Sequence, residues 1–505
     1  MKTAIVIGAG VGGLAAAIQL ARAGVRVRLF ERGSQVGGKL REIDLGGRKI
    51  LGGPSVLTMR WVFDELFDGR LADYVTLTPV DPLCRHFFAD GSQLDLFTDG
   101  DQSREAIRRF AGNRDADGYM KFRKQAHKIF DIVRKPFMEE AVPSLFDFMS
   151  PRSLWQLTQI DGLRTLMRAV EDYFVDPRLR QLFARYATYN GSSPYHAPAT
   201  LAVIAHVENA HGIFGVAGGI YRLAEALERR ARELGVDIVT DSDVEEIVVE
   251  PSGGPLATAL RARGVRVNGG VEWADCVVAN CDIADAYGRL LADVAPARKQ
   301  IQKYAEEELS LSAYVLLALA PKPQTPALVH HNVFFSSDYA REFRQLVDER
   351  RPPDDPTVYV CHERATHDDD SNEAPYFILT NAPPLADKSA IQTIDWNIEA
   401  ARCRERIERV LARHGWTLTP SATNELTPRD FAQRFPSSRG AIYGLASNSR
   451  LAAFKRPANT FPNISGIYFC GGSVHPGAGL PMVALSARIA TRLALTNEWK
   501  DTERA

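Results

Sequence analysis

Apolar segments alternate with turn residues along the chain, and their order near the N-terminus is the most informative. Residues 3–7 form a short apolar run, residues 14–23 carry apolar side chains at helical spacing, and Gly24 separates them from a second apolar run that starts at Val25. Short runs of this kind are typical of buried strands, and the spacing of 3.6 residues is typical of a helix. The pattern predicts a strand–helix–strand unit and an α/β fold.

A glycine-rich turn joins the first strand to the helix. Gly8, Gly10 and Gly13 have the spacing in which the first glycine makes a tight turn, the second lets a pyrophosphate approach and the third lets helix and strand pack closely. The helix N-terminus then offers free N–H groups to phosphates. Glu31 ends the second strand roughly 20 residues further on, where a carboxylate accepts the ribose hydroxyls. This order predicts a dinucleotide site, and the acid argues against NADP.

Other segments predict strands, a helix and a loop. Residues 235–250 alternate valine and isoleucine with polar residues, and the apolar runs at 273–279 and 313–321 predict buried strands. Near the C-terminus, residues 467–470 predict a strand and residues 482–495 a helix rich in small side chains. The RPPDDP stretch that starts at Arg351 predicts a turn-rich loop.

An apolar stripe at helical spacing follows residues 150–174, from Leu154 and Leu157 to Val170 and Phe174. It predicts a helix that packs on the core. The alternative is a helix at a membrane surface, with Trp155 and the arginines at the interface. The periodicity alone does not separate the two.

Composition narrows the class of protein. The chain has 505 residues, of which 45% are hydrophobic and 24% charged, so it can bury a large core. Its formal net charge of −1 provides no basic field for nucleic acid. The six cysteines contain no C-x-x-C pair, which favours a reducing compartment and gives no sign of a metal site. No run approaches the roughly 18 to 20 apolar residues that span a bilayer.

The segments after Glu31 resemble the amine oxidase and phytoene desaturase superfamily of flavoproteins. GSQVGGKLRE, residues 33–42, is similar to the glycine-pair segment that passes alongside FAD there, and GGPSVLT, residues 52–58, to the next flavin-contacting turn. The resemblance implies that FAD binds here, with Lys39 and Arg41 supplying positive charge near the phosphates or the flavin. It also implies that the backbone of Val244 binds the adenine.

The C-terminal stretch YFCGGSVHPGAGLPMVAL resembles the signature of the carotenoid desaturases. A helix that starts after Pro481 would point its N–H groups at the flavin. Because Cys470 lies inside the predicted strand, we expect FAD to be bound noncovalently. The residues expected to contact FAD are Gly8, Gly10, Val11, Gly12, Gly13, Glu31, Arg32, Gly38, Lys39, Arg41, Gly53, Pro54, Ser55, Val56, Val244, Gly472, Pro481 and Met482.

Within this group, GPSVLTMRWVFDELF from Gly53 and LRQLFARYATYNGSSPYHAPATL from Leu179 look most like the bacterial 1-hydroxycarotenoid 3,4-desaturases, also called methoxyneurosporene dehydrogenases. The resemblance implies FAD-dependent desaturation of an acyclic 1-hydroxy- or 1-methoxycarotenoid. A buried hydroxyl requires a polar partner. The candidates for contact with the substrate are Arg185, Tyr189, Asn190, His196 and His475. No residue stands out as a catalytic base.

The resemblance implies a Rossmann-like FAD-binding domain of the glutathione-reductase type with an inserted α+β substrate domain. We expect residues 1–80, 212–300 and 430–505 to form the discontinuous FAD-binding domain. Residues 81–211 and 301–429 are expected to form the substrate domain, which would face the membrane.

Two other functions remain open, a multi-step phytoene or diapocarotenoid desaturase and a nonenzymatic lipid-binding protein of the same fold. For the enzyme we expect peripheral association with the cytoplasmic side of the inner membrane, reoxidation by oxygen or a quinone, and no nucleic-acid partner.

Overall fold

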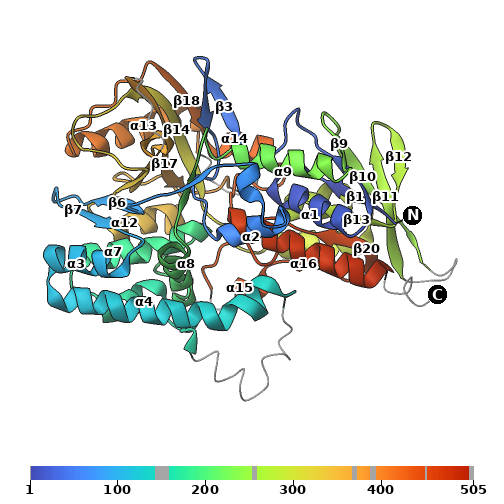
Figure 1. Ribbon diagram of the computed structural model, residues 1–505, viewed down its shortest axis with the longest axis horizontal. Coiled ribbons are helices and arrows are strands. Elements are labelled where there is room, and N and C mark those ends of the chain that lie inside the picture. Colours follow the sequence, from blue (N-terminus) through green and yellow to red (C-terminus); the bar gives the residue numbers. More distant parts are fainter. Residues whose placement is uncertain are drawn as a thin grey trace.

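A computed structural model describes residues 2–142, 159–252, 259–366, 372–386, 394–449 and 452–499. Two sheets organise these residues into two lobes (Figure 1). Strand β1 and helix α16, the first and last described elements, lie at the first sheet, and a group of helices that includes α3, α4, α7 and α8 lies below the second (Figure 1). The α/β class predicted from the sequence is confirmed.

The first sheet has nine strands within the described residues. In spatial order they are β10 (Val244–Pro251), β11 (Leu260–Val267), β20 (Ile464–Phe469), β13 (Cys276–Ala279), β1 (Thr3–Ile7), β2 (Arg26–Phe30) and β9 (Asp237–Val239), with β12 (Gly270–Trp273) on β11 and β19 (Thr460–Phe461) on β20. Strands β20, β13, β1, β2 and β9 run parallel. Parallel strands end at one edge, where ligands of α/β sheets bind.

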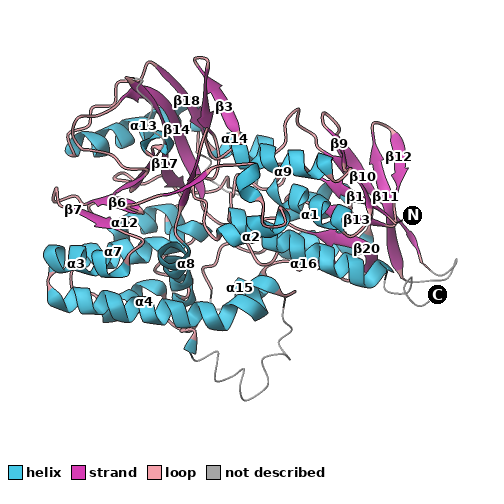
Figure 2. Cartoon of the chain, in the orientation of Figure 1, coloured by secondary structure: helices cyan, strands magenta, loops and turns pink. Residues whose placement is uncertain are grey.

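Helices cover the first sheet because their apolar faces match its buried strands. Helix α1 (Val11–Arg22) packs against both α9 (Arg222–Glu233) and α16 (Leu480–Trp499). Figure 2 shows these helices beside the strands of this sheet. The predicted strand–helix–strand unit is confirmed, although α1 starts at Val11, earlier than the apolar spacing indicated.

The second sheet has seven strands among the described residues. In spatial order they are β18 (Ala422–Leu426), β14 (Ser312–Pro321), β17 (Glu373–Ala382), β16 (Val358–Cys361), β15 (His331–Phe334), β6 (Cys84–Phe87) and β7 (Gln93–Leu96). Strand β14 is buried up to Ala320, as the apolar run predicted. Its side chains alternate between a core under α13 (Trp396–Arg413) and a core shared with the first lobe. A strand buried on both faces is apolar throughout.

Helices of the second lobe enclose a core of aromatic rings. Phe174 and Phe183 stack with ring centroids 4.4 Å apart, and Phe122 packs on both. The helices of this lobe are α3 (Gly100–Ala111), α4 (Asn113–Val133), α6 (Leu166–Tyr173), α7 (Pro177–Ala184), α8 (Val203–His211), α12 (Tyr339–Phe343) and α13.

The remaining elements are short. The small sheets pair β3 (Glu42–Leu45) with β4 (Arg48–Leu51) and β5 (Leu77–Pro79) with β8 (Phe214–Val216). The other helices are α2 (Arg60–Leu66), α10 (Ile283–Asp285), α11 (Ala295–Ala305), α14 (Pro428–Arg434) and α15 (Ala452–Lys455).

The strands of the first sheet come from residues 1–80, 212–300 and 430–505, and those of the second from 81–211 and 301–429. We therefore propose the domain division expected from the sequence.

Two predicted elements differ from the structure. In the predicted helix over 150–174, residues 150–158 lie outside the described part, residues 161–164 form a turn, and the helix α6 spans Leu166–Tyr173. Its apolar side chains pack on the core, whereas Leu163 is 71% exposed. The predicted strand over 273–279 is divided, because Trp273 ends β12 and β13 starts at Cys276.

None of the helices within the described residues is long and apolar enough to cross a membrane.

Substituting alanine for Phe183 should destabilise the second lobe. The ring is fully buried against Phe174, and its loss leaves a cavity that costs about 3–5 kcal/mol. Urea unfolding of Phe183→Ala measures the effect, with Ile398→Ala, at a 55% exposed position of α13, as the control. Equal midpoints for the two variants would contradict this account of the core.

Candidate active site

A cavity of about 1530 Å³ lies between the two sheets. Its walls include Ile7 and Val244 from the first sheet and Val315, Val333 and Phe377 from the second. Pockets for one drug-sized ligand have volumes of about 300–1,000 Å³. The volume is therefore sufficient for a nucleotide and a second ligand together.

The first wall of the cavity is the turn between β1 and α1. Gly8 has a φ of +90°, which favours glycine, and a Cβ at Gly13 would lie 1.9 Å from the Gly8 carbonyl oxygen. Gly13 thus brings α1 close to β1, as predicted. Gly10, Val11 and Gly12 line the cavity at the start of α1, where free N–H groups and the helix dipole favour an anion.

Asn280, just beyond the end of β13, explains why the turn consists of glycines. A Cβ at Gly10 would lie 2.9 Å from its Oδ1, and a Cβ at Gly12 would lie 2.6 Å from its Nδ2. The Asn280 amide donates to the carbonyl of Cys470 over 3.0 Å. The glycine spacing predicts that Gly10 makes room for a pyrophosphate, and the structure shows that it also makes room for the side chain of Asn280.

Glu31 follows β2 at the cavity wall, and backbone amides hold its carboxylate. Its Oε2 accepts from the N–H of Ala9 over 2.7 Å, and its Oε1 accepts from the N–H of Gly33 over 2.8 Å. A carboxylate oxygen has further acceptor capacity. Glu31 is therefore oriented without a ligand and can still accept from hydroxyl groups.

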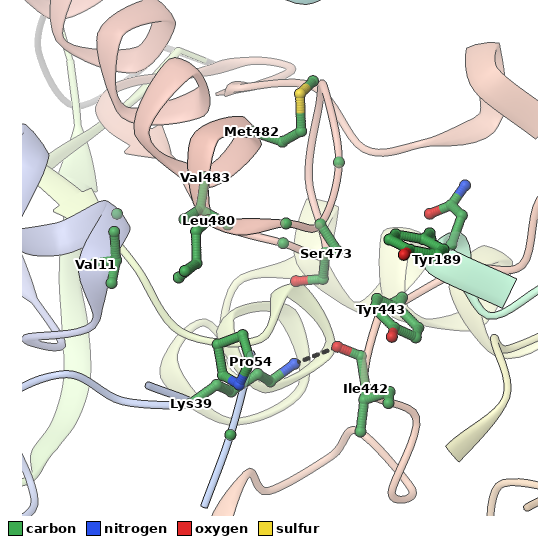
Figure 3. Close-up of a pocket in the computed structure, with 18 of the residues that line it drawn as sticks. Val11, Lys39, Pro54, Tyr189, Ile442, Tyr443, Ser473, Leu480, Met482 and Val483 are labelled. Atoms are coloured by element: carbon green, nitrogen blue, oxygen red, sulfur yellow. Dashed lines mark hydrogen bonds between the residues drawn. The ribbon is translucent and has the colours of Figure 1, made fainter. Parts of the chain in front are cut away.

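Lys39 and the Gly53 turn pack together on another wall. A Cβ at Gly53 would lie 1.8 Å from the Lys39 carbonyl oxygen. The Lys39 ammonium donates to the Ile442 carbonyl over 2.8 Å (Figure 3), and burial lowers the pKa of Lys39. Burial and the charge of Arg434 lower the pKa of Arg41 to about 10. Two half-buried cationic side chains, Lys39 and Arg41, thus lie at the cavity wall.

The loop between β20 and α16 closes the cavity. Figure 3 shows Ser473, Leu480, Met482 and Val483 around it. The buried Arg456 guanidinium donates to the Gly472 carbonyl over 2.8 Å and fixes this loop. Helix α16 starts at Leu480, slightly earlier than predicted. Cys470 does not line the cavity, in keeping with noncovalent binding.

The structure brings the predicted cofactor residues together. All of them line the cavity except Gly13, which packs behind the turn. Those that line it are Gly8, Gly10, Val11, Gly12, Glu31, Arg32, Gly38, Lys39, Arg41, Gly53, Pro54, Ser55, Val56, Val244, Gly472, Pro481 and Met482.

The candidate substrate residues divide into two groups. Arg185, Tyr189 and Asn190 line the cavity. His196 is exposed and lies outside the lining. His475 is buried behind the wall, where its Nε2 is 3.0 Å from the carbonyl oxygen of Glu140, and burial lowers its pKa to about 4. Neither His196 nor His475 therefore lies where it could contact a ligand in the cavity.

Sequence reasoning missed several polar residues at the cavity, among them Glu208, Arg456 and Tyr359. Glu208 is a buried carboxylate in α8, and its position among the apolar residues of VIAHVENA was the available signal. Arg456 and Tyr359 gave no signal, because each reaches the cavity through tertiary packing. The cavity is therefore more polar at some points than the motifs indicated.

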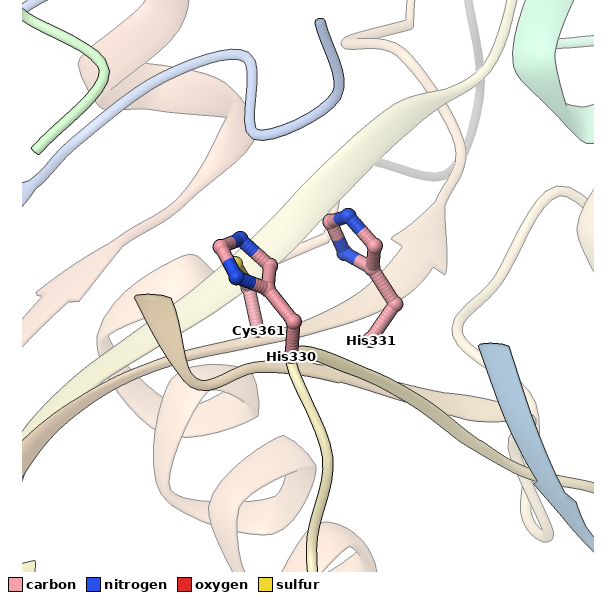
Figure 4. A group of neighbouring side chains, drawn as sticks. All are labelled: His330, His331 and Cys361. Atoms are coloured by element: carbon pink, nitrogen blue, oxygen red, sulfur yellow. The ribbon is translucent and has the colours of Figure 1, made fainter. Parts of the chain in front are cut away.

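His330, His331 and Cys361 form a buried cluster beside Tyr359 (Figure 4). The Tyr359 hydroxyl is 2.7 Å from Nδ1 of His331 and 2.8 Å from the Ser55 hydroxyl at the cavity wall. The potential metal-ligating atoms of the cluster lie within 4.8 Å of one another, and Nδ1 of His330 faces the Thr366 hydroxyl as Nδ1 of His331 faces that of Tyr359. Burial raises the pKa of the Cys361 thiol. We assign the cluster to support of the Tyr359 hydroxyl.

Replacement of Glu31 by alanine should reduce the bound flavin. The variant loses both the acceptor for the ribose and the carboxylate that holds the amides of Ala9 and Gly33. Flavin absorbance per protein after gel filtration is the measurement, and Glu245→Ala, at an exposed carboxylate, is the control. Full flavin occupancy in Glu31→Ala would show that the ribose assignment is wrong.

Known proteins resemble this chain along nearly its whole length. The family model of flavin-containing amine oxidoreductases matches residues 11–495. A hydroxyneurosporene desaturase of Rubrivivax gelatinosus is 37% identical over 98% of this chain and 93% of that protein. A 4,4'-diapolycopene oxygenase of Methylomonas sp is 35% identical over 96% of either chain.

A solved structure of a putrescine oxidase variant has a TM-score of 0.62 at 15% identity and covers 100% of both chains, which shows the shared fold. The relatives and the family model show more than the fold. This chain belongs to the flavin-containing amine oxidoreductase family, within it to the carotenoid desaturases, and it is an FAD-dependent oxidoreductase.

Proposed function

We propose that this protein desaturates an acyclic carotenoid with FAD as the hydride acceptor. The observation that supports the proposal is one continuous cavity. It extends from the glycine turn between β1 and α1 to an apolar compartment. The apolar walls of that compartment comprise Ile132, Val133, Ile204, Val207, Ala313, Val315, Val333, Phe377 and Leu379. A long uncharged polyene requires walls of this kind and few polar anchors.

The residues of the cavity fit FAD. The N-terminus of α1 and its glycines suit the pyrophosphate, Glu31 suits the ribose, and Lys39 with Arg41 add positive charge. When bound, FAD would supply the acceptor for a hydride from a C–H bond, while the neighbouring carbon would lose a proton. We propose that it is held noncovalently, because burial raises the pKa of Cys281, the cysteine in the cavity wall, and keeps it a thiol.

The remaining contribution of the protein is to align the polyene and to exclude water. Allylic positive charge is delocalised over the polyene itself, so the proton on the neighbouring carbon becomes acidic without a strong base. We assign no catalytic base.

For the substrate we propose a 1-hydroxy- or 1-methoxycarotenoid, oxidised at the 3,4 bond. The segment around Arg185 and the name of the Rubrivivax gelatinosus relative support this choice. The alternative is a multi-step phytoene or diapocarotenoid desaturase. The name of the Methylomonas relative, a diapolycopene oxygenase, supports a diapocarotenoid as the substrate. A nonenzymatic lipid-binding role does not agree with membership of an oxidoreductase family.

We further propose peripheral attachment to the cytoplasmic face of the inner membrane, from which a carotenoid enters. The 71% exposed Leu163 lines the cavity together with the half-buried Ile160 and Phe137. An exposed apolar side chain at a cavity rim suits contact with lipid. Oxygen or a membrane quinone would reoxidise the flavin.

Turnover of 1-hydroxyneurosporene and neurosporene, measured side by side with the flavin-loaded enzyme, tests the substrate. We expect faster 3,4-desaturation of the hydroxylated carotenoid. Equal or faster turnover of neurosporene or phytoene would favour the multi-step alternative.

Alkaline carbonate or mild detergent should release the protein from membranes, because it is held by surface contacts. Leu163→Glu should weaken sedimentation with phospholipid vesicles severalfold, since a charge replaces the exposed apolar side chain at the rim. Ile398→Glu, at a similarly exposed position of α13, is the control. Resistance to both extractions would exclude peripheral attachment.

A further inference from the structure

Two opposite charges are buried in the wall of the cavity without forming an ion pair. Arg185 starts the 3₁₀ segment η4 (Arg185–Asn190) and is 6% exposed, and Glu208 in α8 is 3% exposed. Both line the cavity. Among the salt bridges of the described residues, none joins them. Buried charges are usually paired directly, so their separation requires an explanation.

Each of the two side chains has hydrogen-bonding capacity that the described protein atoms leave unused. Arg185 donates from Nη1 to the Tyr189 hydroxyl over 3.2 Å, whereas its Nε and Nη2 have no partner in the described part of the chain. Oε1 of Glu208 likewise has no partner there. Leaving such groups unsatisfied is costly in a folded protein. Two donor nitrogens and one acceptor oxygen are therefore left without a partner in side chains that line the cavity.

Asn190, a candidate from the sequence, is already engaged. Its amide donates to the Ser447 hydroxyl, and its Oδ1 accepts from Arg456 over 3.4 Å. The unused donors and acceptor belong to Arg185 and Glu208.

We propose that Arg185 and Glu208 form a subsite for a hydroxyl group at one end of the polyene. The guanidinium donates to the hydroxyl oxygen, and the hydroxyl donates its hydrogen to the Glu208 carboxylate. This inference rests on the proposed function, which leaves open whether the substrate is the 1-hydroxy- or the 1-methoxycarotenoid. A methyl ether can accept from Arg185 but has nothing to donate to Glu208, so the subsite selects the free hydroxyl over the ether.

The position of the subsite agrees with oxidation at the 3,4 bond. The carbon that carries the hydroxyl is two bonds from that bond, so its anchor has to lie near the flavin. Asn190 in the same segment accepts from Arg456, which in turn donates to Gly472 in the flavin loop. Arg456 thus bridges the segment that carries Arg185 and the loop expected to contact FAD.

The flavin-loaded Glu208→Gln variant tests the subsite. Wild-type enzyme should prefer 1-hydroxyneurosporene over its methyl ether and over neurosporene by about tenfold or more in kcat/KM, the effect of one buried unpaired group. In Glu208→Gln the preference over the ether should fall to about twofold, because an amide can also donate to the ether oxygen. Arg185→Lys keeps the positive charge but loses the planar guanidinium with its several N–H donors. It should reduce the preference for 1-hydroxyneurosporene over neurosporene.

Glu399→Gln is the matched control, because Glu399 is a buried carboxylate of the second lobe that pairs with Arg406 outside the cavity lining. It should keep the wild-type preference. Binding of each carotenoid, measured by quenching of flavin fluorescence, separates the subsite from the chemistry. If Glu208→Gln abolishes the binding preference, the subsite is supported, whether or not the enzyme turns over any of these carotenoids. If the wild-type enzyme turns over none of them, the proposed function is rejected.

Equal binding of the three carotenoids to wild-type enzyme, or an unchanged preference in both Glu208→Gln and Arg185→Lys, would overturn the subsite. Desaturation of any of these carotenoids would still uphold the proposed function in that case.

Discussion

The side chain of Asn280 occupies the point where the two glycine turns of the first lobe meet. A Cβ at any of Gly8, Gly10, Gly12, Gly13 or Gly471 would come within 3.2 Å of Asn280. Its amide also donates to the carbonyl of Cys470 at the end of β20. Three segments that are far apart in the chain therefore share one close-packed junction, and the cavity opens beside it. Larger side chains at this junction would separate the strand ends that form the nucleotide site.

The buried Arg456 and the half-buried Lys39 extend this arrangement toward the second lobe. Arg456 donates to carbonyls of Tyr443, Leu445 and Gly472, and Lys39 donates to that of Ile442. Backbone carbonyls thus satisfy these positive charges and hold the loops of the cavity in place. Arg185 and Glu208 differ, because the protein leaves part of their hydrogen-bonding capacity unused. That contrast distinguishes structural charges from charges available to a ligand.

Strand β14 joins the two lobes in one packing arrangement. One set of its alternating side chains packs under α13, and the other faces the core of the first lobe and the cavity, where Ala313 and Val315 lie. The same strand therefore provides both a stable core and the apolar wall that a polyene requires. Support for the lobe and the lining of the cavity are inseparable along this strand.

The sequence by itself determined the nucleotide site. The order of strand, glycine turn, helix and acid is local. The need for glycine at Gly13 comes from the Gly8 carbonyl in the same turn, and the need at Gly8 comes in part from its own positive φ. For the same reason the C-terminal loop and helix were recognisable, with shifts of a few residues at their starts. Strand β14 could be predicted because burial on both faces makes its sequence apolar throughout.

The tertiary structure alone decided which polar residues face the cavity. Glu208 and Arg456 reach it through packing between segments far apart in the chain, as in the hydrogen bond from Arg456 to Asn190, and no local pattern encodes such contacts. His196 and His475 stand next to motif residues in the sequence, yet packing places one at the surface and the other behind the wall. Local periodicity and backbone sterics can be read from neighbouring residues, whereas the direction of a side chain depends on the packing of the whole chain.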